Sequence, residues 1–126
     1  MIENWNKYPN FTKSEFDCQK TGENEMSPRF MDLLQLLRTR YGKPMKITSG
    51  YRSPKHSIER KKVKPGTHAQ GIAADIYCVG PDKYRLVKLA LELGFTGIGV
   101  DKSFIHLDVS KERCAICGYD RDWETQ

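Results

Sequence analysis

The chain has 126 residues, of which 38% are hydrophobic and 29% are charged. This length predicts one domain, residues 1–126, with enough chain to bury a core without disulfides. Lysine and arginine number 21 against 16 acidic residues, and the net charge of +5 suits an anionic partner without identifying one. No apolar run reaches the roughly 18 residues of a membrane span, and the first fifteen residues lack a secretory signal. We therefore expect synthesis in the cytoplasm and no membrane insertion.

Four cysteines, Cys18, Cys78, Cys114 and Cys117, are too few for a disulfide framework in a domain of this length. Cys114 and Cys117 form a CxxC, a spacing typical of a zinc knuckle or a redox pair. No second CxxC accompanies it. The sequence favours reduced thiols, with a structural metal as the alternative.

Three helices are predicted from their starts and stops. Thr12 followed by Glu15 is a capping-box pattern for a short helix. Ser27 precedes a helix over Pro28–Arg40, which has proline at its first position and apolar residues at helical spacing. A second amphipathic helix opens at Pro81 and stops at Gly94.

Four strands are predicted between and after these helices. They span Met45–Ser49, Ile72–Val79, Gly97–Val100 and Phe104–Val109. Helices and short strands in mixed order indicate a small α+β domain.

One carboxylate lies inside an apolar strand. Asp75 follows Ile72, Ala73 and Ala74 and precedes Ile76. An ionised carboxylate there is costly unless it is paired, hydrogen-bonded or bound to a metal. His68 lies seven residues upstream, on the other face of an unbroken strand. A turn at Gly71 would bring His68 back toward Asp75.

The last predicted strand alternates between two kinds of side chain. One face carries Ile105, Leu107 and Val109, and the other carries Phe104, His106 and Asp108. Two imidazoles and one carboxylate, from His68, His106 and Asp75, would leave a catalytic zinc one open position. Structural hydrogen bonds between the same side chains are the alternative. The spacing excludes the helical HExxH class of metalloprotease.

At these residues the sequence resembles a known family, the zinc D-Ala-D-Ala carboxypeptidases and L-alanyl-D-glutamate endopeptidases. These enzymes cut peptidoglycan stem peptides and share their fold with the Hedgehog signalling domain. The motifs are Ser49-Gly50-Tyr51-Arg52, His68-Ala69-Gln70-Gly71-Ile72-Ala73-Ala74-Asp75, Gly97-Ile98-Gly99-Val100 and Phe104-Ile105-His106-Leu107-Asp108. The resemblance covers a core of about residues 11–109 and leaves a polar tail, 110–126. It implies a small, mainly antiparallel sheet flanked by helices.

The resemblance assigns zinc to His68, Asp75 and His106. It gives Arg52 the task of holding the substrate and the charge at the reaction centre, which suits the rigid fork of a guanidinium. Substrate contacts are expected from Tyr51 as well. Thr67 is expected to supply the hydroxyl that the family often places one residue earlier, at Gly66.

The general base is the point where the chain departs from well-studied members. Their glutamate, three residues before the last histidine, is replaced by Ser103. Another branch places its base five residues before that histidine, so Asp101 is the expected base. An ordinary turn aspartate is the alternative for Asp101. Asp108 is expected to orient His106.

The resemblance implies a zinc peptidase that hydrolyses a bond in peptidoglycan stem peptides, of carboxypeptidase or endopeptidase type. We expect a monomeric phage or prophage lytic enzyme, an endolysin or virion protein, that reaches the wall after release. The basic run Arg60–Lys64 has no interleaved aromatics, so nucleic acid is not an expected partner. His56 is expected to be an exposed loop residue. Two alternatives remain: a non-catalytic zinc-binding or structural module of this fold, and a zinc amidohydrolase acting on a non-wall substrate.

Overall fold

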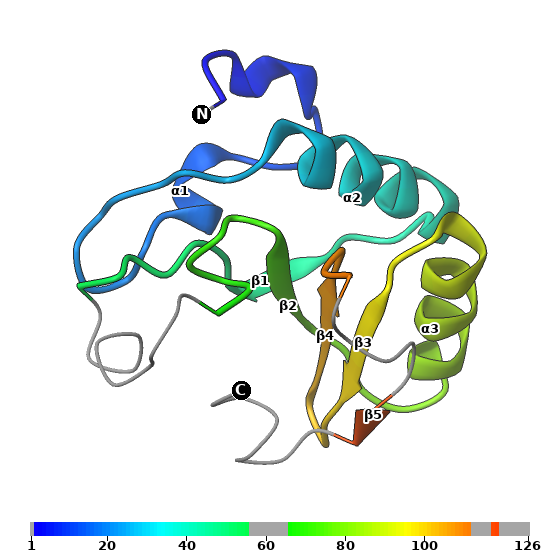
Figure 1. The fold of residues 1–126 in the computed structure, drawn as a ribbon. Helices are drawn as coiled ribbons and strands as arrows, with labels where there is room; N and C mark the ends of the chain where they lie inside the picture. The colour runs from blue at the N-terminus through cyan, green and yellow to red at the C-terminus, as the bar shows by residue number, and fades with distance from the viewer. Residues whose placement is uncertain (1, 56–65, 112–116, 119–126) are drawn as a thin grey trace.

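A five-stranded sheet with helices packed on it forms the centre of the computed structural model, which describes residues 2–55, 66–111 and 117–118 (Figure 1). The α+β class is therefore confirmed. The elements in chain order are η1 (Trp5–Lys7), α1 (Lys13–Phe16), α2 (Pro28–Tyr41), β1 (Lys46–Ser49), β2 (Ala73–Tyr77), α3 (Asp82–Leu93), β3 (Gly97–Val100), β4 (Phe104–Asp108) and β5 (Cys117–Gly118).

The helices begin and end at the residues that the sequence indicates. In α1 the Thr12 backbone N–H donates to Glu15 Oε1 at 2.7 Å, which is one half of a capping box. In α2 the Ser27 hydroxyl accepts from the backbone N–H of Phe30 at 3.3 Å. The last residue of α2 is Tyr41, one residue later than predicted, and Gly42 and Gly94 close α2 and α3 in the left-handed conformation. No helix in the described part of the chain has the length and apolar character to span a membrane.

The strand order is β1-β2-β4-β3-β5. The first four strands pair antiparallel, and β5 pairs parallel with β3. The sheet is therefore mainly antiparallel, as expected. Two elements, η1 and β5, were not predicted.

The two faces of the sheet differ in chemistry, because directly paired residues lie on the same face. Ile76 pairs with Ile105 and Ala74 pairs with Leu107, and these side chains join one hydrophobic cluster. The buried faces of both long helices belong to this cluster, through Phe30, Leu34, Leu37, Leu86 and Ala90. The other face carries Asp75, His106 and Asp108, so the predicted alternation of 104–108 is confirmed.

A tight turn before β2 sets the approach of the chain to this polar face. The Gly71 N–H donates to the carbonyl of His68 at 3.2 Å, and its own carbonyl accepts from the Ser27 N–H at 2.8 Å. Gly71 has φ +74°, and a Cβ there would overlap the carbonyl oxygen of Glu25. Only glycine combines this conformation with so close an approach. The turn brings His68 back to Asp75, as the sequence predicted.

Several sequence features lie outside the described residues. His56, the run Arg60–Lys64 and Cys114 are among them. Cys117 is described as backbone only, in β5 opposite Gly99. The interpretation of the CxxC stays a prediction.

Gly71→Ala is expected to lower the free energy of unfolding by about 2–5 kcal/mol, since it adds left-handed strain to an overlap with backbone. Gly80→Ala is the matched control. Gly80 has φ +68° and nothing within 4 Å of an added Cβ, so its expected loss is only about 1–2 kcal/mol. Urea denaturation of both variants measures the difference. Equal losses of unfolding free energy in the two variants would show that the backbone around Gly71 shifts at little cost to make room for a Cβ.

Candidate metal centre

Three buried side chains from two strands and one turn meet on the polar face of the sheet. Asp75 in β2 pairs directly with His106 in β4, and the turn at Gly71 brings in His68. The exposed fractions are 5% for His68, 6% for Asp75 and 2% for His106. One ligand atom from each residue lies within 4.8 Å of the other two.

The His68 ring is fixed so that one nitrogen is free to bind. Its Nδ1 donates to the carbonyl oxygen of Gly50 at 2.8 Å, because a carbonyl only accepts. In the neutral ring the lone pair is then on Nε2, which is buried without a hydrogen-bond partner and lies 3.4 Å from Asp75 Oδ1. Buried polar atoms are nearly always satisfied, so this lone pair marks a place for a ligand.

The His106 ring is fixed by carboxylates on both sides. Its Nε2 donates to Asp108 Oδ2 at 2.8 Å, and its Nδ1 lies 2.8 Å from Asp75 Oδ1. Asp108 is fully buried and also accepts from the Ser110 N–H at 2.9 Å. A Cβ on Gly97 would overlap the whole Asp108 carboxylate, so glycine makes the room for it. Asp108 thus holds His106 with Nδ1 turned toward Asp75.

The electrostatics of the group favour a bound cation. Burial opposes charge on His106, but the hydrogen bonds to Asp108 and Asp75 outweigh it and raise the pKa of the imidazole. Burial by itself would raise the pKa of Asp75, yet the interaction with the facing His68 ring and the hydrogen bond with His106 lower it well below its usual range. The carboxylate is therefore ionised, and the site stabilises positive charge next to it.

These three residues fit zinc. His68 Nε2 lies 3.4 Å and His106 Nδ1 lies 2.8 Å from the same carboxylate oxygen, Asp75 Oδ1, so three donor atoms of types that zinc prefers converge on one place. Both metal-facing nitrogens belong to rings whose other nitrogen donates to an oxygen, the usual support of a zinc histidine. Two imidazoles and one carboxylate leave a position open for water or substrate.

A protein-family model described as Peptidase M15 matches residues 9–108, a span that contains the whole candidate centre. The chain belongs to the Peptidase M15 family. Comparison with curated proteins gave no match. M15 peptidases are zinc-dependent hydrolases, so membership indicates a metallopeptidase, and the His68–Asp75–His106 group gives this member the side chains to bind the metal.

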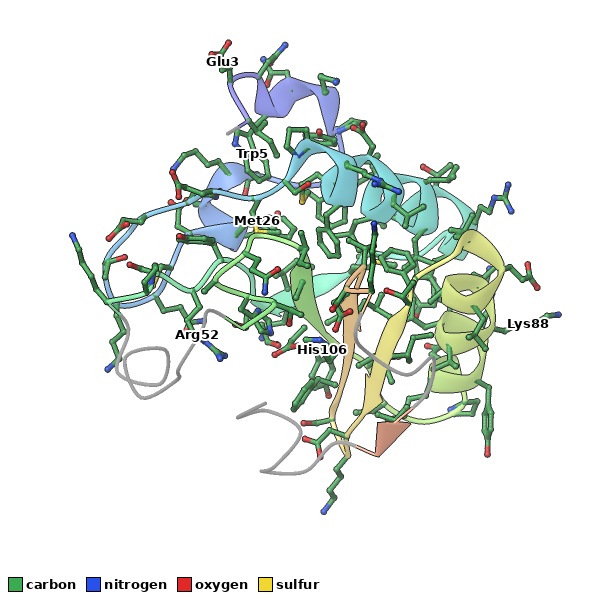
Figure 2. All side chains as sticks on the ribbon, viewed as in Figure 1. Glu3, Trp5, Met26, Arg52, Lys88 and His106 are labelled. Carbon is green, nitrogen blue, oxygen red and sulfur yellow. The ribbon has the colours of Figure 1, made fainter. Side chains whose placement is uncertain are left out.

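The structure describes the surroundings of three other predicted residues of this M15 peptidase, Arg52, Thr67 and Tyr51. The Arg52 N–H donates to the carbonyl of His68 at 3.2 Å, and Arg52 and Lys88 lie on opposite sides of His106 in Figure 2. Thr67 is buried immediately before His68. Tyr51 is 4% exposed and joins the hydrophobic core. Its burial raises the pKa of the phenol. The substrate-binding roles of these residues stay predictions.

Asp101 and Ser103 lie in the turn between β3 and β4. The half-buried Asp101 follows Gly99 by two positions, and its N–H donates to the carbonyl of Phe104 at 3.0 Å. Lys83 Nζ donates to the Asp101 carbonyl at 2.7 Å. Ser103 is exposed, and its carbonyl accepts from the backbone of Cys78. The role of Asp101 as the base stays a prediction.

Sequence reasoning named Asp108 as the partner of His106 but missed the other groups that orient the two rings. The Gly50 carbonyl is a backbone atom, and no residue type reports its direction. Gly97 leaves space for the Asp108 carboxylate, and the Ser110 backbone N–H donates to it. The pairing of Gly97 with Asp108 is a usable signal, but it can be seen only once the register of β3 and β4 is known.

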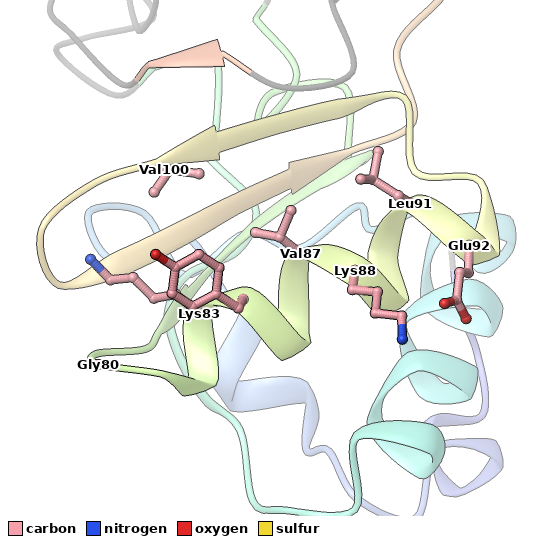
Figure 3. Close-up of a pocket in the computed structure, with 8 residues that line it drawn as sticks. Gly80, Lys83, Val87, Lys88, Leu91, Glu92 and Val100 are labelled. Carbon is pink, nitrogen blue, oxygen red and sulfur yellow. The ribbon is translucent and has the colours of Figure 1, made fainter.

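A groove of about 800 Å³ lies elsewhere, between α3 and β3 (Figure 3). Its lining includes Tyr84, Val87, Leu91 and Val100. Val100 belongs to the helix-covered side of the sheet, since it pairs with Ile105. The groove shares no residue with the candidate metal centre.

Asp108→Asn is expected to weaken zinc binding about 10–100-fold, the usual effect of losing a partner of a metal-bound histidine. The two Asp108 oxygens accept separately from His106 Nε2 and from the Ser110 N–H, whereas an asparagine amide has only one acceptor oxygen. Competition with a chromophoric chelator measures the affinity. The matched control is Asp82→Asn at the start of α3, which should bind zinc like the unchanged protein. Equal affinity of both variants would contradict the orienting role of Asp108.

Proposed function

We propose that this M15 peptidase hydrolyses a peptide bond in peptidoglycan stem peptides, as a D-Ala-D-Ala carboxypeptidase or an L-Ala-D-Glu endopeptidase. The observation that carries the proposal is the buried, unpartnered Nε2 of His68 facing Asp75 in a chain of this family. The motifs around His68, Asp75 and His106 resemble those of the peptidases that cut these bonds.

Zinc, when bound, supplies a Lewis acid that polarises the scissile carbonyl and makes a water molecule acidic near neutral pH. His68 Nε2, Asp75 Oδ1 and His106 Nδ1 would hold it. The Gly50 carbonyl and the Asp108 carboxylate keep the two rings in the binding orientation. This preorganisation avoids a rearrangement at the moment of reaction.

Two further side chains complete the proposed reaction. Asp101 takes the proton of the attacking water and returns it to the leaving amine. Arg52 binds a substrate carboxylate or the oxygen that becomes negative as water adds, with two parallel N–H groups. Support comes from their positions. Arg52 is bonded to the loop of His68, and Asp101 lies in the turn that leads into the strand of His106.

The biological setting that we propose is wall degradation by a phage or prophage lytic enzyme that acts after release from the cytoplasm as a monomer. The net charge of +5 supports attraction to an anionic cell wall. Nucleic acid is not part of the proposal.

One observation favours a second candidate, a non-catalytic module that keeps the zinc. Ser103 occupies the position where well-studied relatives carry their glutamate base, and a serine alone cannot act as a base. Cleavage of peptidoglycan separates this candidate from the peptidase.

The zinc-loaded protein is expected to release peptides from purified peptidoglycan. Mass spectrometry of the products identifies the bond by new D-Ala or L-Ala termini. Products from a non-wall amide alone would indicate an amidohydrolase instead. Asp101→Asn is expected to lower kcat by about 100–10,000-fold, the usual contribution of a general base.

Two further variants control this experiment. His106→Ala should lose both stoichiometric zinc and activity, whereas Asp101→Asn should keep its zinc. Ser103→Ala should retain full activity. No cleavage by zinc-loaded protein, with full zinc content, would support the non-catalytic module.

A further inference from the structure

The polar face of the sheet continues past the metal centre as a row of three side chains. Lys46 pairs with Tyr77 across β1 and β2, and Tyr77 pairs with Phe104 across β2 and β4. Direct partners share a face, and so do residues two apart on one strand. Tyr77 is two residues from Asp75, and Phe104 is two residues from His106. The row therefore lies on the same face of the sheet as Asp75 and His106, displaced from them by about 7 Å along the strands.

Exposure rises across the centre toward this row. On the far side of the centre Ala73 and Asp108 face each other and are both fully buried. Asp75 is 6% exposed, and Tyr77 is 50% exposed. Along β4 the exposure likewise rises from Asp108 to the half-buried Phe104. Among the described residues, the polar face of the sheet is therefore more exposed on the side of Tyr77 and Phe104.

The row combines two kinds of binding chemistry. The exposed ring of Tyr77 offers an apolar face for an aliphatic side chain, and the half-buried Phe104 lies beside it. Lys46 is exposed, and no acidic side chain in the described ranges 2–55, 66–111 and 117–118 forms an ion pair with it. Its ammonium is thus available for a carboxylate from outside the chain.

We propose that Lys46 and Tyr77, bordered by Phe104, form a substrate subsite for an acidic peptide, with an aliphatic side chain on the Tyr77 ring and a carboxylate on Lys46. The inference rests on the proposed function, which supplies the peptide bond at the centre. The separation of about 7 Å is the step between alternate side chains of an extended peptide. A peptide whose scissile carbonyl reaches the centre therefore carries a side chain over the row.

The first test is Tyr77→Ala in the zinc-loaded protein, with a stem pentapeptide containing L-Ala-D-Glu and D-Ala-D-Ala as substrate. KM is expected to rise about tenfold with kcat within about twofold, since the subsite binds ground state and transition state alike. Zinc content should stay unchanged. The matched control is Tyr84→Ala, because Tyr84 is 84% exposed on α3 and lies away from the centre. That variant should behave like the unchanged protein.

The second test is Lys46→Ala with two substrates, the same pentapeptide and its analogue with an amidated glutamate carboxylate. KM is expected to rise about three- to tenfold for the acidic peptide and to stay constant for the amide. Lys88→Ala, another exposed lysine, is the matched control.

Each outcome decides between the subsite and the activity. Cleavage with KM unchanged in both variants would overturn the subsite and leave the proposed function intact. If nothing is cleaved, calorimetric binding of the pentapeptide decides. Weaker binding to Tyr77→Ala than to Tyr84→Ala would keep the subsite and reject the activity, whereas equal or absent binding would reject both. Competition by peptide-free glycan strands, without binding of the pentapeptide, would overturn the assignment to a peptide.

Discussion

The Asp75 carboxylate, buried in the second strand between two imidazoles, is the constraint on which the site depends. A lone charge in such a place is unfavourable, and here two imidazoles compensate it together. His106 comes from the adjacent strand, His68 returns through a glycine turn, and the pairing register aligns them. These contacts depend on one another. The His106 ring is oriented by its hydrogen bond to Asp108, and the Asp108 carboxylate fits only because Gly97 has no side chain. One face of the sheet thus carries the polar site residues, and the other face packs into the hydrophobic core.

This division explains how so small a chain holds both a core and a reactive site. The helices α2 and α3 cover only the apolar face, where Ile76, Ile105 and Leu107 meet their buried side chains. The polar face is buried at Asp108 and opens gradually toward Tyr77. The candidate metal centre lies between these extremes, buried enough to strengthen its electrostatic interactions and adjacent to the more exposed end of the face.

The sequence predicted the parts that local rules govern. Ser27 before Pro28 and Gly94 after a helical pattern mark helix ends through backbone geometry, and the alternation of 104–108 separates the faces of β4 without knowledge of its partner. The grouping of His68 with Asp75 was predictable because Gly71 signals a turn. The parts that stayed hidden depend on register and on backbone atoms. The parallel pairing of β5 with β3, the Gly50 carbonyl behind His68 and the alignment of Tyr77 with Phe104 arise only when distant segments are brought together.

The irregularity in β1 has a consequence for the outer edge of the sheet. The pairing of β1 with β2 shifts between Ile47 and Ser49, so that Ser49 faces Asp75. A bulge of this kind twists a strand and interrupts its hydrogen-bonding row. β1 ends the strand order, spans four residues, and is preceded by Pro44. Short length, a bulge and flanking lysine and proline discourage one sheet from adding to another. The four residues of β1, which include Lys46 of the proposed subsite, are thus poorly suited to edge-to-edge aggregation.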